Sequence, residues 1–378
     1  MKTLTLKFAL FLILISFGFS LTGFSQSKKE ANFTVSSGDL LDVSLKQGNI
    51  NIVTGSGNEV KVIAKNIDED ELNLLTMEQK SGKVEVKFKG EDSDNFKLEC
   101  IIPEAMNLDL STGGGNVLIK GDLKGSIDAS TAGGNIATGN VNGKTKISTG
   151  GGNVSVGDIN GDADLTSAGG EMKAGSITGE TKISTAGGSI SIGSVSNSAE
   201  ISTAGGNIQV GDIGGKVEVS TAGGNIKVGN VTGSAEISTA GGNIKLESAN
   251  GEVEASTAAG NVNLKNIKGS VDANTAAGNI YAELYPDGKV KSELNTAVGN
   301  ITLKVPESSK ATIVATFNVL VWNGDDSDLD NIKSDFTLKE IKRNKEKKQI
   351  EVVYELNGGG PTIELNVAMG QIEIRKLK

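Results

Sequence analysis

The stretch Ile201-Ser202-Thr203-Ala204-Gly205-Gly206-Asn207-Ile208, ISTAGGNI, decides how this chain folds. It returns at Ile237 to Ile244 and, with valine in first place, at Val219 to Ile226. The position of its asparagine recurs along the chain at Asn116, Asn135, Asn153, Glu171, Ser189, Asn207, Asn225, Asn243, Asn261 and Asn279. The first step in this series is 19 residues and the others are 18. A fixed period of this kind indicates a solenoid, in which each repeat forms one coil.

Aliphatic residues recur at fixed offsets from this asparagine and alternate with polar residues, which is the period of a β-strand. The position that follows the asparagine is apolar in every repeat: Val117, Ile136, Val154, Met172, Ile190, Ile208, Ile226, Ile244, Val262 and Ile280. Glycine interrupts each coil three times, for example at Gly223-Gly224, Gly229 and Gly233. We therefore predict three short strands and three corners per coil, with glycine supplying positive φ at the corners.

Two other solenoids fit a period of 18 less well. A left-handed hexapeptide helix needs an aliphatic residue every six positions, but the series Val231, Ile237 continues to Asn243. A calcium β-roll needs G-G-x-G-x-D, and the segment from Gly241 to Leu246 reads GGNIKL. The sequence therefore predicts an all-β fold, a single-stranded right-handed parallel β-helix with about 18-residue coils and irregular β caps.

The repeat also divides the chain. Lys2 and Lys7, an apolar run at 8–19 and the small-x-small triplet at 23–25 predict a signal peptide at 1–25. We expect an N-terminal cap and irregular first coils at 26–110, regular repeats at 111–304, and a C-terminal excursion with a capping coil at 305–378. No later apolar run is long enough for a transmembrane segment. We expect export to the periplasm, the outer-membrane surface or the medium.

Composition narrows the function. The chain has no histidine, which excludes imidazole metal sites and histidine acid–base catalysis. A formal charge of -9 is unfavourable for nucleic acid, and a single cysteine, Cys100, allows no intrachain disulfide. Carboxylate-based polysaccharide lyases and hydrolases remain an alternative, although the coils from Asn116 to Asn279 contain no aromatic residue and Tyr281 follows at their far end. Because regular coils lack one distinct place for catalysis, we predict a non-enzymatic protein. We also expect the protein to be a monomer and to have no cofactor.

Two polar columns accompany the corners. Glycine before asparagine resembles a phosphate loop, but a strand follows here instead of a helix. We predict a structural ladder of amide hydrogen bonds between coils about 4.8 Å apart at Asn207, Asn225, Asn243, Asn261 and Asn279. The second column is threonine, as at Thr203 and Thr221. Its hydroxyls are either half-buried and bonded between coils or exposed, and exposed threonines would suit an ice-binding face.

A third column is acidic and faces outward. It consists of Glu200, Glu218, Glu236, Glu254 and Asp272. Carboxylates that repel one another along a stack are balanced by solvent and lysines such as Lys216, or by a divalent cation, and calcium accepts several carboxylate oxygens. This column is the candidate calcium face. The run 326–330, DSDLD, resembles the start of a calcium loop, but Asn331 and Thr337 stand where that loop needs glycine and glutamate.

The S-T-A-G-G-N-I and G-N-I corners behind a signal peptide resemble a bacterial putative adhesin family of β-strand-repeat proteins of unknown function, related to the head GIN domain. The resemblance covers about Gly48 to Lys376. It implies a cell-envelope β-helix with an adhesive role, and it supplies no catalytic residues. We expect the partner to be an envelope protein or a glycan. The alternative is a glycan-binding or glycan-processing β-helix that uses the irregular region 305–358 and its tryptophan, Trp322.

Overall fold

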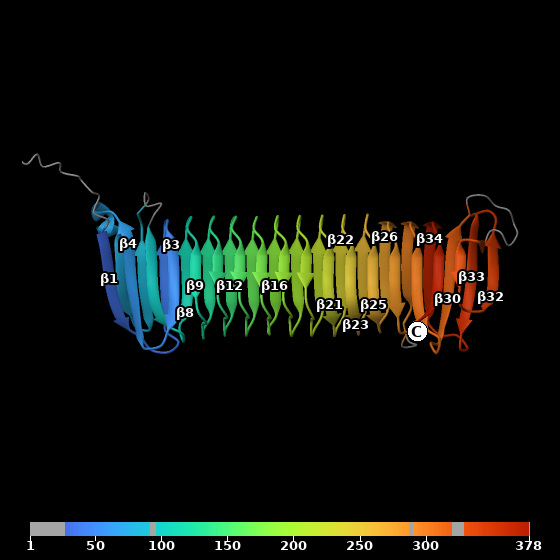
Figure 1. The fold of residues 1–378 in the computed structure, drawn as a ribbon, viewed down its shortest axis with the longest axis horizontal. Helices are drawn as coiled ribbons and strands as arrows, with labels where there is room; N and C mark the ends of the chain where they lie inside the picture. Colours follow the sequence, from blue (N-terminus) through green and yellow to red (C-terminus); the bar gives the residue numbers. More distant parts are fainter. Residues whose placement is uncertain (1–26, 91–95, 287–289, 320–328, 378) are drawn as a thin grey trace, which may run out of the picture.

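The protein is a rod built almost entirely of β-strands, which lie side by side along its long axis (Figure 1). The computed structural model describes residues 27–90, 96–286, 290–319 and 329–377. The predicted signal peptide, Trp322 and residues 326–328 lie outside these ranges. Among the described residues, no helix is long and apolar enough to cross a membrane. The predicted all-β, solenoid-like fold with predominantly parallel pairing is confirmed.

The first of two long sheets runs the length of the rod. Its order along the axis is β1 (Ser27–Thr34), β4 (Glu59–Ile67), β7 (Lys97–Pro103), β3 (Asn49–Gly55), β9 (Val117–Lys120), β11 (Ile136–Thr138), β13 (Val154–Val156), β15 (Met172–Ala174), β17 (Ile190–Ile192), β19 (Ile208–Val210), β21 (Ile226–Val231), β23 (Ile244–Ala249), β25 (Val262–Ile267), β27 (Ile280–Leu284), β29 (Ile301–Pro306), β35 (Ile372–Leu377) and β31 (Ile332–Ser334). Pairing is parallel except where β4 meets β1 and β7.

The second sheet runs beside the first. Its order is β5 (Leu75–Lys80), β6 (Lys83–Phe88), β2 (Leu40–Leu45), β8 (Asn107–Thr112), β10 (Ile127–Thr131), β12 (Thr145–Thr149), β14 (Ala163–Ser167), β16 (Thr181–Thr185), β18 (Ala199–Thr203), β20 (Val217–Thr221), β22 (Ala235–Thr239), β24 (Val253–Thr257), β26 (Val271–Ala277), β28 (Ser292–Val298), β34 (Thr362–Met369), β30 (Ala311–Asn318), β33 (Gln349–Leu356) and β32 (Leu338–Asn344). A short 3-10 helix, η1 (Glu69–Leu74), precedes β5.

The third side of the regular coils is shorter than a strand, although we predicted three short strands per coil. Neighbouring coils pair there through single residues such as Val195 and Ile213, which form isolated parallel bridges. Gly211 and Gly214 flank this position closely, so only one side chain per coil can point inward before the chain turns again. In both sheets, pairing of the regular coils joins residues 18 apart, for example Ile208 with Ile226.

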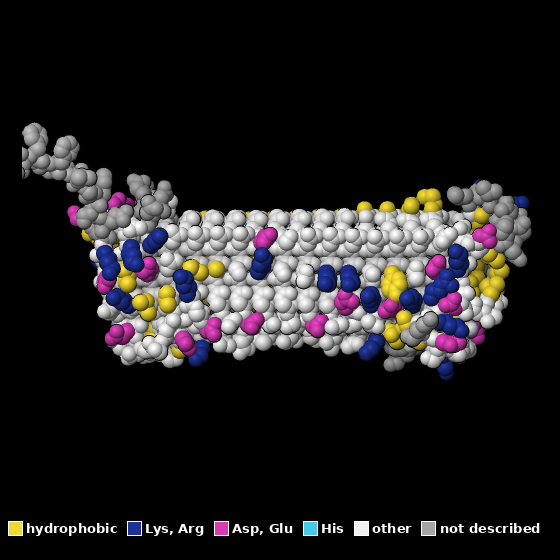
Figure 2. Space-filling view, viewed as in Figure 1, with side chains coloured by type: hydrophobic (Ala, Val, Ile, Leu, Met, Phe, Trp, Pro, Cys, Tyr) yellow, Lys and Arg dark blue, Asp and Glu magenta, His cyan; other side chains and the backbone are white. Residues whose placement is uncertain are grey.

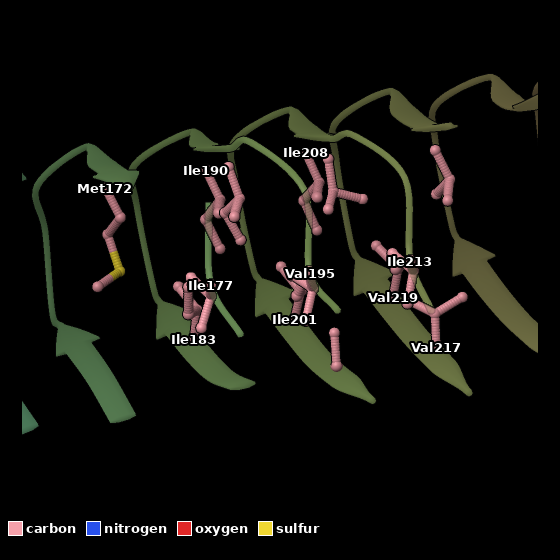
Figure 3. Packing of buried hydrophobic residues seen from close by; sticks show 14 of the residues in the cluster. Met172, Ile177, Ile183, Ile190, Val195, Ile201, Ile208, Ile213, Val217 and Val219 are labelled. Atoms are coloured by element: carbon pink, nitrogen blue, oxygen red, sulfur yellow. The ribbon is translucent and has the colours of Figure 1, made fainter. Parts of the chain in front are cut away.

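The core is a set of stacked aliphatic columns inside the coil (Figure 3). Met172, Ile190 and Ile208 form one column from the first sheet, and Ile183 and Ile201 belong to the column from the second sheet. Each of these side chains is at most 1% exposed. Because like side chains stack on like, every coil buries its apolar surface against its two neighbours rather than against itself.

Corner glycines are needed for a different reason from the one that we expected. A Cβ on Gly242 would lie 1.9 Å from the carbonyl oxygen of Gly224 in the preceding coil, and the same clash recurs along the column. Among the described glycines, positive φ occurs mainly toward the ends of the rod, as at Gly48 and Gly370, and not at Gly242. Close stacking of backbones therefore requires glycine at the regular corners, and the explanation by positive φ is wrong there.

At both ends of the rod, the order of the strands along the axis differs from their order in the sequence. The chain forms β2 and β3, moves outward to β4–β7, and then returns to place β8 and β9 on the inner side of its first coil. At the other end it passes from β28 and β29 outward to β30–β33 and returns as β34 and β35 (Figure 1). The segment from β30 to β33 thus covers the end of the solenoid.

The outermost strands carry charged side chains. β32 is exposed over most of its length, and its Lys342 contacts Glu351 at 2.7 Å. At the opposite end, Glu30 of β1 pairs with Lys61 of β4 at 3.4 Å. Charged edge strands oppose the addition of another strand.

Candidate functional site

Hydrogen bonds join the corner asparagines of neighbouring coils from Asn207 to Asn279. The backbone N–H of Asn225 donates to Oδ1 of Asn207 at 2.8 Å, and its Nδ2 also contacts this oxygen at 3.2 Å. The same backbone bond joins Asn243 to Asn225, Asn261 to Asn243 and Asn279 to Asn261. The main donor is thus the backbone amide rather than the side-chain amide. These five side chains hold the corner, and none is directed toward a cavity by these bonds.

The threonine column is buried, which decides between the two alternatives left open by the sequence. Thr239 is 6% exposed, donates to the carbonyl of Gly224 at 3.0 Å and accepts from the N–H of Gly242 at 3.2 Å. Thr221 and Thr203 make the same pair of bonds one and two coils earlier, respectively. A buried threonine presents no hydroxyl to solvent, so this column cannot form an ice-binding face.

The acidic column is longer than the five residues that we singled out. Glu200, Glu218, Glu236, Glu254 and Asp272 lie in register on the outer face of the second sheet. The pairing of β26 with β28, and of β28 with β34, adds Glu293 and Glu364 to the same row. These two residues interrupt the period of 18, because a turn and the C-terminal excursion precede them, and sequence reasoning missed them.

Lysines compensate only part of this charge. Lys182 contacts Glu200 at 3.0 Å, an interaction that raises the pKa of the lysine, and Lys216 lies 3.8 Å from Glu236. Within the described ranges, Glu218 and Glu254 have no lysine at salt-bridge distance. No group of three or more histidine, cysteine, aspartate or glutamate side chains described by the structure is arranged to hold a metal ion. Calcium at this column remains a prediction.

A shallow groove lies beside the acidic column at the C-terminal end of the second sheet. We call it the amide groove and define it by Asn274, Asn295, Asn366, Thr316, Asn318 and Gln349. The three asparagines lie in register on β26, β28 and β34, and Thr316 on β30 continues their row. The regular repeats and the C-terminal excursion meet here, so no single stretch of sequence could have indicated this site.

Cys100 and Tyr281 are described residues whose pKa values are raised, and neither is activated as a nucleophile. Burial raises the pKa of the Cys100 thiol to about 12, which keeps it protonated. Burial is also the main cause that raises the pKa of Tyr281, whose hydroxyl bonds to Glu283. Lys304 lies 5.2 Å from the centre of the Tyr281 ring.

Figure 2 shows one face of the rod, where charged side chains gather toward the two ends and uncharged side chains fill most of the middle.

A stack of near-identical coils with polar columns on its outer faces defines a β-solenoid protein. Residues 214–375 match the family described as Toastrack DUF4097, whose name marks a domain of unknown function. The predicted resemblance to a family of unknown function is confirmed over these residues, which make up less than half of the chain. No curated protein matches the chain.

Three solved structures are similar to the chain at low identity. A putative adhesin from Parabacteroides merdae is 16% identical, with 65% of this chain and 95% of that chain covered and a TM-score of 0.30. A putative adhesin from Bacteroides fragilis is 16% identical, with 68% and 98% covered and a TM-score of 0.29. A putative lipid binding protein from Parabacteroides distasonis is 15% identical, with 93% and 97% covered and a TM-score of 0.23.

Proposed function

We propose that the chain is a non-enzymatic, extracytoplasmic scaffold that serves as an adhesin or as an interaction protein of the cell envelope. The observation that supports this most is the repetition of exposed columns along a rigid axis. From Asn49 to Gln371 the corner column takes twelve steps, or roughly 58 Å at about 4.8 Å per step. We also propose that the coils of about 18 residues wind in the right-handed sense, which nearly all parallel crossover connections share.

The mechanism would be multivalent contact. Each coil offers the same small set of polar groups, so a partner with a matching repeat can bind at several coils at once. Weak contacts that are linked on a rigid body raise the overall affinity well above that of one contact. A protein that worked only as a spacer would show no such dependence on the number of exposed coils.

Retention of coated beads under flow tests this mechanism. Beads carrying the purified chain would be passed over cells that produce the protein, next to beads carrying a variant that lacks residues 199–234. The deletion removes two coils and joins Ser198 to Ala235 in register. Multivalent adhesion predicts a steep loss of retention with the shorter rod, whereas equal retention of both bead populations would contradict it.

Export needs its own test, because the predicted signal peptide lies outside the described residues. We propose that residues 1–25 are removed and that the mature protein is held in the periplasm, on the outer-membrane surface or in the medium. Mass spectrometry of protein recovered from each fraction should find an N-terminus at Gln26. A cytoplasmic protein that keeps residues 1–25 would contradict this placement.

The glycan alternative has one observation in its favour. The amide groove joins the regular coils to the C-terminal excursion, the region that the alternative assigned to sugar binding. This supports binding of a glycan but gives no reason to expect its cleavage. A glycan ligand would also be compatible with adhesion.

A further inference from the structure

The lining of the amide groove is uncharged throughout, although the groove borders a charged row. All of its lining side chains are amides, hydroxyls or small apolar groups. Two residues before each floor asparagine stand Asp272, Glu293 and Glu364 of the acidic column. Lys291 contacts Glu293 at 3.7 Å and Glu364 at 2.8 Å, so one lysine faces three carboxylates. The negative charge that is left disfavours phosphates, sulfates and other polyanions. The ligand chemistry that fits best is therefore neutral and rich in hydrogen-bonding groups.

The floor of the groove is held in a fixed orientation. Nδ2 of Asn366 donates to Oδ1 of Asn295 at 2.8 Å, and Nδ2 of Asn295 donates to Oδ1 of Asn274 at 2.8 Å. At the start of the row, Nδ2 of Asn274 donates to Asp272 at 2.6 Å. The amides therefore point along the rod axis in one direction, and a ligand meets a preorganised row rather than mobile side chains.

Hydrogen-bonding groups remain unused where the row ends. The side chains of Thr316, Asn318 and Gln349 make no hydrogen bond to another described residue, and all three are partly or fully exposed. Each of these side chains can both donate and accept. Sugar hydroxyls have the same double capacity, so they can replace the water that such groups otherwise bind.

An apolar shoulder runs along the corner beside the groove. Val298 and Met369 are paired in register and are 47% and 50% exposed. The equivalent position in the regular coils is glycine, as at Gly223 and Gly241. The position becomes Ala259 and Ala277 in the two preceding coils, and it carries a large apolar side chain in the coils of Asn295 and Asn366. An apolar strip next to hydroxyl-binding groups suits a sugar ring, whose C–H face is apolar and whose edge is polar.

We propose that the amide groove binds a linear, uncharged glycan that lies parallel to the rod axis. Successive floor residues repeat at the strand spacing of about 4.8 Å, which is close to the advance per sugar in an extended chain. Consecutive sugars can then meet equivalent amides. This inference deepens the proposed function, because it names the class of ligand that the adhesive rod recognises.

Titration calorimetry with soluble hexasaccharides tests the proposal. The probes are uncharged β-1,4-glucan and β-1,4-xylan chains, and oligogalacturonate serves as the matched anionic chain. We expect saturable binding of at least one uncharged chain and none of oligogalacturonate. Absence of saturable binding for both uncharged chains, or preferred binding of the anionic one, would overturn the proposal.

Variants locate the binding site. The double substitution N318A and Q349A removes two unused amides, and we expect it to weaken binding about tenfold. A second variant, Val298→Glu, places a charge on the shoulder and should weaken binding without touching either amide. Ser202→Ala with Ser220→Ala, on the same sheet in the middle of the rod, is the control. Unchanged affinity in both groove variants, with melting curves like that of the parent, would contradict the site.

The same variants separate this inference from the proposed function. Beads coated with the N318A and Q349A variant should lose retention if the groove carries adhesion. Retention that persists while glycan binding is absent would reject the groove and leave the adhesive scaffold standing. Loss of retention for the two-coil deletion alone would place the adhesive contacts on the regular coils.

Discussion

At the scale of single residues, the stacked backbone decides which substitutions the coil tolerates. The two glycines of a corner look equivalent in the sequence, but their surroundings differ. A Cβ on Gly241 would meet its nearest neighbour, the carbonyl oxygen of Gly223, at 3.6 Å, an ordinary contact. At Gly242 the corresponding distance to Gly224 is 1.9 Å. The chain itself follows this distinction, since Ala259 and Val298 occupy the position of Gly241 in later coils.

The first prediction compares these two glycines. Gly242→Ala should destabilise the protein by about 1–3 kcal/mol, because the new methyl group forces two backbones apart. Gly241→Ala, the matched control, should change the free energy of unfolding little. Chemical denaturation of both variants measures the difference. Similar unfolding curves for the two would show that the backbone spacing described here is wrong.

The second prediction concerns Asp109, which lies in register between Asp42 and Asp128. Burial, followed by repulsion from these two carboxylates, raises the pKa of Asp109. The folded state therefore holds this proton more tightly than the unfolded state does. The stability that the proton contributes is complete below the unfolded pKa and is lost as the pH rises through the folded pKa.

We expect Asp109→Asn to remove this component. The variant should gain stability relative to the parent as the pH rises from below the unfolded carboxyl pKa through the raised pKa of Asp109, as measured by denaturation at several pH values. Asp164→Asn, at the equivalent position of a later coil, is the control for loss of one negative charge. Parallel pH profiles for the parent and the Asp109 variant would contradict the raised pKa.

At the scale of elements, equivalent residues of successive coils stack into columns. These columns could be predicted from the sequence wherever the period of 18 residues holds. Between Asn135 and Asn279 the alternation of polar and apolar residues indicated which side chains face inward, because each strand pairs with an equivalent strand 18 residues away. The amide groove could not be predicted, since Asn366 reaches Asn295 across 71 residues. No local pattern encodes a pairing at that separation.

The third prediction tests the acidic column as a calcium face. Calcium would be titrated calorimetrically into the parent and into a variant with Glu218, Glu236 and Glu254 changed to glutamine. If carboxylates of neighbouring coils share the ion, the heat of binding should disappear in the variant. Equal heats in the two proteins, or none in the parent, would leave the column as a solvated row that lysines such as Lys182 and Lys216 partly neutralise.

At the scale of the whole molecule, near-identical coils make the length of the rod adjustable. Each coil contacts only its neighbours, so whole coils can be removed without leaving an unfilled core. Both caps should remain in place, because they are formed by β1–β7 and β30–β35 and not by the middle coils.

The fourth prediction follows from this arrangement. The variant without residues 199–234 should fold cooperatively and be shorter by roughly 10 Å, two steps of the strand spacing, in small-angle X-ray scattering. Deletion of residues 199–225, one and a half coils, is the control, because it joins Ser198, which normally leads into β18 of the second sheet, to Ile226 of β21 in the first sheet, so that a second-sheet strand is missing from the stack. We expect that control to misfold. A cooperative, shortened control would contradict the coil length.

By itself the sequence determined the repeating part of this protein: the strands, the inward columns, the asparagine corners and the acidic row up to Asp272. It did so because a period of 18 places equivalent residues on top of one another, so local order already specifies long-range contacts. Only the tertiary structure decided how the rod ends. There the chain moves outward and returns, and β34 enters between β28 and β30. Hydrogen bonding between segments far apart in sequence, rather than any local pattern, creates the caps and the groove beside them.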